Sequence, residues 1–154
     1  MSFKLVENKI DDNKFISCKD FFNPIRSKKD KSSPIKFDMC EFTLCLLVGL
    51  KNDRKELLKD YQFRKDNFAQ RYIDEYLEIK PLITGLLLSK IIKNAGIDRN
   101  EKSKVKDIMK NALDSNDPLF LKKETIDIMH QYYLGGFCIL LNEFEYKPPV
   151  DVSV

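Results

Sequence analysis

The chain contains no tryptophan, one histidine and only five glycines among its 154 residues. It has no Asn-Gly or Asp-Gly pair, the strongest short signal for a β-hairpin, and little of the alternation expected of strands. No Cys-x-x-Cys pair accompanies the single histidine, His130, so the short-spaced ligand pairs of a structural zinc site are missing. We therefore expect neither a β-rich fold nor a metal or other cofactor.

Long apolar runs are also absent. The longest, Phe42 to Leu50, falls well short of the roughly 20 apolar residues that a membrane-spanning helix needs. Charges interrupt the apolar pairs at the N-terminus, where a signal peptide would carry an apolar segment. We expect a cytoplasmic protein with no membrane partner, whose four cysteines are reduced and mostly buried. These are Cys18, Cys40, Cys45 and Cys138.

The composition is that of an ordinary folded domain. Hydrophobic residues make up 43% of the chain and charged residues 33%, which excludes a disordered tail and a collagen-like repeat. The length suits one domain. A net charge of +3 neither requires nor excludes a nucleic-acid partner.

Apolar residues recur with helical spacing from residue 38 onward, so we expect an all-α fold, a compact bundle of about five helices. Helices are predicted over residues 38–50, 66–79, 81–95, 100–113 and 122–144, with a core built from 39–50, 82–92 and 126–141. Three regions follow: a poorly structured N-terminal segment with a charged loop (1–37), a helical domain (38–146) and an extended tail (147–154). Within the first, Lys4 to Val6 is a candidate strand.

Glycines mark two places in the predicted helices. Gly49 falls near the end of its helix, where a left-handed C-terminal cap is expected. Gly135 and Gly136 lie in the middle of the last helix, where together they cost roughly 2 kcal/mol relative to two alanines. Either a neighbouring helix packs closely against them or the helix kinks there.

Few residues form a catalytic arrangement. Cys138 and His130 share a predicted helix, but eight residues separate them by about 12 Å, which is beyond hydrogen-bond reach. Asp74, Glu78 and Lys80 imitate the acidic-x-lysine signature of a metal-dependent nuclease, although a solvated helix face accounts for the same residues. We expect no enzyme activity, and a metal-dependent nuclease is the further alternative.

Basic side chains gather in two stretches that are candidates for nucleic-acid binding. They are Lys28, Lys29, Lys31, Lys102, Lys104 and Lys106. DNA contact needs these charges on one face, and nearby acidic residues dilute them, so a solvated surface is the competing interpretation. A small DNA-binding module using these basic loops is the alternative function, although we expect any contact with nucleic acid to be indirect.

Adjacent tyrosines suggest a contact surface for a protein partner. Tyr132 and Tyr133 point about 100° apart on a helix, so both are difficult to bury in one core. We expect one of them to be exposed and to bind a partner together with Phe137 and the tail residues Pro148 and Pro149. The alternative is a tyrosine that lies flat with its hydroxyl in water.

Two short motifs carry a resemblance to known proteins. Phe37, Asp38 and Glu41 open an apolar helix that ends in Val48 to Lys51, and the segment YYLGGFCIL follows at Tyr132 to Leu140. This order resembles small helical accessory proteins of bacterial DNA phosphorothioation (Dnd-type) and related anti-phage islands. Middle subunits of three-component anti-phage systems built on SMC-like ATPases are similar in size and helicity.

The resemblance spans about residues 35–145 and carries over no catalytic residues. It implies a non-enzymatic accessory subunit of a bacterial anti-phage, DNA-targeting defence complex. Such a subunit would dock onto a larger ATPase or nuclease. It leaves open whether the protein also forms a homo-oligomer.

Overall fold

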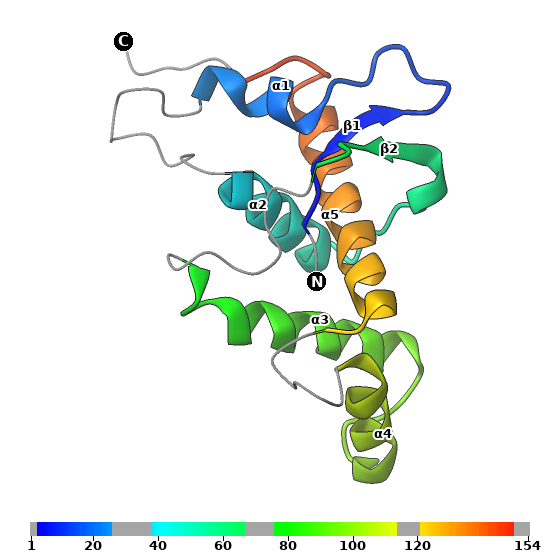
Figure 1. The fold of residues 1–154 in the computed structure, drawn as a ribbon. Coiled ribbons are helices and arrows are strands. Elements are labelled where there is room, and N and C mark those ends of the chain that lie inside the picture. The colour runs from blue at the N-terminus through cyan, green and yellow to red at the C-terminus, as the bar shows by residue number, and fades with distance from the viewer. Residues whose placement is uncertain (1–2, 26–37, 67–75, 114–120, 150–154) are drawn as a thin grey trace.

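The computed structural model describes residues 3–25, 38–66, 76–113 and 121–149, and these ranges contain five α-helices and one two-stranded sheet (Figure 1). The elements are, in chain order, β1 (Val6–Lys9), α1 (Cys18–Phe22), the 3-10 turn η1 (Asn23–Ile25), α2 (Asp38–Lys51), the 3-10 turn η2 (Leu58–Asp60), β2 (Tyr61–Phe63), α3 (Lys80–Asn94), α4 (Lys102–Ala112) and α5 (Lys123–Glu143). The fold is mostly helical, as predicted, but the strictly all-α prediction is wrong because a sheet is present.

Figure 1 shows α2 and α5 side by side at the centre, with the β1–β2 ribbon toward one end of the molecule and α3 and α4 toward the other. The two strands pair antiparallel, with Val6 opposite Phe63 and Lys9 opposite Tyr61. The predicted strand at Lys4 to Val6 shares only Val6 with β1. Because the strands are far apart in the sequence, no hairpin signal connects them.

The N-terminal residues belong to the core. Their buried side chains are Phe3, Leu5, Val6, Phe15, Cys18, Phe21 and Phe22. For residues 3–25 the prediction of a poorly structured segment is therefore wrong, since these residues cover the α2–α5 pair. The charged loop predicted after them lies outside the described residues.

The backbones of α2 and α5 touch at two glycines. A Cβ atom added to Gly136 would lie 2.7 Å from the carbonyl carbon of Cys45 and 2.7 Å from the amide nitrogen of Gly49. A Cβ atom on Gly49 would collide in turn with the carbonyl group of Tyr132. Of the two predicted alternatives, close packing of a neighbouring helix is confirmed. The predicted cap at Gly49 is wrong, because α2 continues to Lys51.

Aromatic rings fill the space on both sides of this contact. Phe42 of α2 stacks on Tyr133 of α5 with ring centroids 4.6 Å apart and an interplanar angle of 19°. Phe137 meets Phe15 and Phe21 edge to face, each at 5.6 Å. The contribution of residues 39–50 and 126–141 to the core is thereby confirmed.

The remaining helices follow their sequence signals with small changes. Pro81 occupies the first turn of α3, as predicted, and Gly96 beyond the end of that helix has a positive φ of 72°. The helix predicted over 66–79 falls largely on 67–75, outside the described residues. No helix in the described ranges is long and apolar enough to cross a membrane.

Candidate functional site

The predicted partner-binding aromatics are not on the surface. Tyr132, Tyr133 and Phe137 all have exposed fractions of 0%. The expectation that one of the tyrosines is exposed is wrong, because α5 is covered on several sides by different elements. Of the two tail prolines, Pro148 is exposed and Pro149 is buried, so only Pro148 remains available from the predicted surface.

Each tyrosine hydroxyl is satisfied by a different element. Tyr133 Oη accepts a hydrogen bond from the amide of Val6 at 3.0 Å, which ties the N-terminal strand to α5. Tyr132 Oη accepts from Asn94 Nδ2 at 2.9 Å and donates to Asp53 Oδ1 at 3.1 Å. Burial raises the pKa of both phenols, so both remain protonated at neutral pH.

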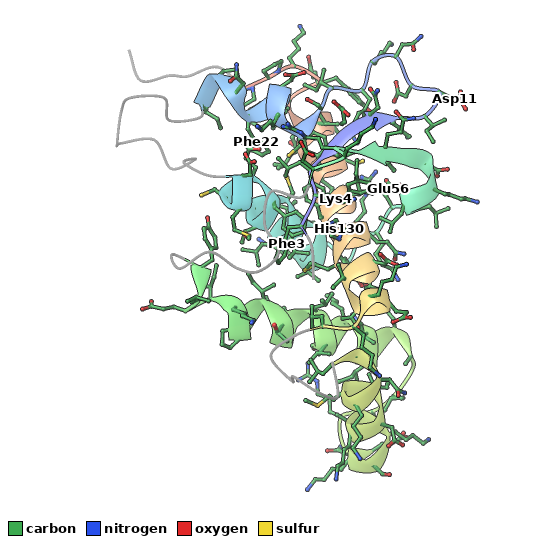
Figure 2. All side chains as sticks on the ribbon, viewed as in Figure 1. Phe3, Lys4, Asp11, Phe22, Glu56 and His130 are labelled. Carbon is green, nitrogen blue, oxygen red and sulfur yellow. The ribbon has the colours of Figure 1, made fainter. Side chains whose placement is uncertain are left out.

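His130 holds the N-terminus next to Tyr133. Its Nε2 accepts from the amide of Lys4 at 3.3 Å, so Nδ1 must carry the proton and donate to the carbonyl of Ile126 at 2.9 Å (Figure 2). Both nitrogens of the neutral imidazole are therefore used. Burial lowers the pKa of His130, with opposing influences from the Ile126 carbonyl and Asp127. Both ring nitrogens of His130 thus serve to hold backbone groups in place.

The cysteines have no histidine partner. Cys138 Sγ lies 3.2 Å from Tyr61 Oη, and burial raises the pKa of the Cys138 thiol. Burial raises the pKa of Cys45 as well. All four cysteines are free: Cys18 and Cys45 are buried, and Cys40 and Cys138 are partly buried. A protonated thiol is a weak nucleophile, so these environments do not activate Cys45 or Cys138.

The structure describes two of the three residues of the nuclease alternative. Asp74 lies outside the described residues, Glu78 is exposed, and Lys80 is partly buried at the start of α3. Within the described ranges, no three His, Cys, Asp or Glu side chains are grouped so that they could hold a metal ion.

The helical arm, defined here as residues 80–113 with α3, α4 and their connection, is attached to the core at the C-terminal end of each helix. At the end of α3, Asn94 bonds Tyr132, and Lys90 Nζ lies 3.9 Å from the same Asp53 carboxylate that Tyr132 contacts. At the end of α4, the carbonyl of Ala112 accepts from the Lys122 amide at 2.9 Å and from Thr125 Oγ1 at 2.8 Å.

One face of α3 packs on the core and another faces solvent. Ile83 and Leu87 are buried at 1% and 0% exposure, while Leu82 and Leu86 are 60% and 40% exposed. Leu77, just before the helix, is 49% exposed. The sequence prediction assigned 82–92 wholly to the core, and this is wrong for the outward face. The sequence did offer one signal for the exposed face: α3 carries apolar residues on nearly every side, whereas a helix with one buried face needs them on that face only.

The second helix of the arm is basic. Lys102, Lys104, Lys106 and Lys110 are all exposed, and the whole arm carries eight Lys and Arg against three Asp and Glu, a net charge of +5. The structure thus brings the predicted Lys102, Lys104 and Lys106 onto one exposed helix and adds Lys110, which sequence reasoning missed. Lys28, Lys29 and Lys31 lie outside the described residues.

The candidate functional site is therefore the helical arm, which has exposed leucines on α3 and exposed lysines on α4. Comparison with known proteins adds no relative to this description: no protein-family model, no curated protein and no solved structure matches the chain.

Proposed function

We propose that this protein is a non-enzymatic accessory subunit that docks onto a larger protein through the outward face of α3. The resemblance of its sequence motifs to anti-phage accessory proteins makes an ATPase or nuclease of a bacterial defence complex the proposed partner. The single observation that supports docking is the pair Leu82 and Leu86, one helical turn apart and 60% and 40% exposed on a helix whose other face is already packed.

The physical reason is the difference in solvent exposure between the large side chains of the core and the leucines of α3. The core encloses Tyr132, Tyr133 and Phe137 completely, so the fold has the means to bury large side chains. Exposed leucines on a neighbouring helix then supply apolar area that becomes favourable only when a partner covers it, at about 25 cal/mol for each Å² removed from water. The proposed docking surface is therefore the outward face of α3 and not the tyrosines that the sequence suggested.

The test is co-expression of the protein with the product of each neighbouring gene, followed by affinity purification and size-exclusion chromatography. We expect a stable complex with the wild type and its loss in the Leu82→Glu/Leu86→Glu variant, because two charges would be buried without partners. Leu57→Glu is the control, since Leu57 is 56% exposed and belongs to a different element, directly before η2.

Persistence of the complex in the double variant would contradict docking through α3. Failure of every co-expressed product to bind the wild-type protein would contradict the proposed function itself. Loss of the complex in both the double variant and the Leu57→Glu control would show a general effect of added negative charge and would equally count against this surface.

A further inference from the structure

Three exposed lysines form a continuous line on α4. Lys102, Lys106 and Lys110 follow one another at every fourth residue, so each lies about 6 Å further along the helix axis and about 40° further around it. All three are exposed, and none forms an ion pair within the described part of the chain. We call these three residues the lysine stripe.

The fourth lysine of the helix is different. Lys104 lies on the opposite flank, about 160° from Lys106 around the helix, and its Nζ is 3.1 Å from Glu101 Oε2. The apolar residues Val105 and Ile108, which are partly buried, separate the two flanks on one side. The unpaired positive charge of α4 is therefore concentrated on one flank, which is the convergence that the sequence alone could not show.

We propose that the lysine stripe binds the phosphate backbone of a nucleic-acid duplex, independently of the α3 docking surface. Evenly spaced point charges suit a polymer whose own charges repeat evenly along its length. Lysine binds phosphate as a point charge, and contacts to phosphate carry no sequence information, so the proposed contact is independent of base sequence.

The composition of the arm favours a duplex over a single strand. Residues 80–113 contain no phenylalanine, tyrosine, tryptophan or histidine. Proteins that hold single strands combine a positive groove with aromatic side chains on which unpaired bases stack. With the charges present and the stacking groups absent, backbone contact with paired strands is the recognition mode that this surface offers.

The same arrangement predicts the strength of the salt dependence. Three neutralised phosphates give a slope of about −2.7 for the logarithm of the association constant against the logarithm of salt concentration. Affinity then falls about 40-fold between 50 and 200 mM salt. Asp107 lies about 60° around the helix from Lys110, and its negative charge repels phosphate. Removing that charge therefore gives a second test of the interaction.

The experiment is fluorescence anisotropy with a labelled 30-base-pair DNA duplex of arbitrary sequence, measured at several salt concentrations. We expect Lys102→Gln/Lys106→Gln/Lys110→Gln to lower the affinity at 50 mM salt at least 10-fold and to flatten the salt slope. Lys14→Gln/Lys51→Gln/Lys59→Gln removes the same charge from exposed positions outside the arm and should change the affinity less than 3-fold. Asp107→Asn should raise it.

Four results would overturn the proposal. They are no binding of the wild type at 50 mM salt, equal losses in the two triple variants, tighter binding of the corresponding single strand, and displacement of the duplex by polyglutamate at equal charge concentration. The last would identify an acidic polypeptide as the partner. Because the lysine stripe and Leu82 are changed in separate variants, failure here leaves the α3 docking test unaffected.

Discussion

The α2–α5 pair and the helical arm use apolar helices in opposite ways. In the pair, a single added methyl group at Gly136 would collide with the backbone of the neighbouring helix. In the arm, a Cβ at Gly85 of α3 would have no atom of the described residues within 4 Å, apart from the adjoining backbone of its own helix. Both α5 and α3 are rich in apolar residues, but Gly136 of α5 is tightly surrounded and Gly85 of α3 is not. The pair stabilises the fold, and the arm presents surface.

The sharpest way to test this contrast is to place the same methyl group in both regions. We expect Gly136→Ala to lower the free energy of unfolding by about 3 kcal/mol or more, because the obstructing atoms are backbone and the helices must separate. Gly85→Ala should instead raise it by about 1 kcal/mol, since alanine is the better helix former and its Cβ would contact no other element in the described ranges. Urea unfolding measures both values, and similar values for the two variants would break the comparison.

A smaller effect is expected where the N-terminal strand is tied to α5. Tyr133→Phe leaves the buried amide of Val6 without its acceptor, so the free energy of unfolding should fall by about 1–3 kcal/mol. Tyr146, which is 39% exposed, provides the control, and Tyr146→Phe should be within about 0.5 kcal/mol of the wild type. Equal values for the two variants would contradict the role assigned to the Val6 contact.

The smallest effect is the pH dependence of stability that arises from His130, a buried residue of the core. Burial lowers the pKa of His130 in the folded chain below the value of 6.5 that it has when exposed. As the pH falls below 6.5, the unfolded chain takes up the proton first. Stability is therefore complete above pH 6.5 and declines below it, by at most about 1.4 kcal/mol per pH unit, until the folded pKa is reached.

Unfolding in urea between pH 7.5 and 5.5 follows this decline directly. His130 is the only histidine in the chain, so a His130→Gln variant should show a clearly flatter profile than the wild type over this range. Parallel profiles for the two proteins would mean that His130 is not held neutral by Lys4 and Ile126.

The positions of four helices could be predicted because they depend on local signals. Apolar spacing located α2 and α5 to within a residue or two, and Pro81 marked the first turn of α3. The β1–β2 pairing could not be predicted, since it joins short strands that are distant in the sequence. Local rules also place Gly49 at a helix end, whereas its position is explained by the backbone of α5.

The candidate site was harder to predict than the fold, for a related reason. Whether Tyr132 or Leu82 is exposed depends on which other elements cover α5 and α3, and helical spacing does not contain that information. Tyr132 is covered because Asn94 and Asp53 come to it from other parts of the chain. The lysines of α4 were recognised as candidates from composition, but their exposure depends on which side of the helix packs.

Equilibrium urea unfolding of Leu82→Glu/Leu86→Glu tests the contrast between core and arm most directly, because it asks whether the outward face of α3 belongs to the folded core. We predict a free energy of unfolding within about 0.5 kcal/mol of the wild type, as for other substitutions of exposed residues. A decrease of 2 kcal/mol or more would show that these leucines are packed in the native protein and would contradict the assignment of this face to a partner.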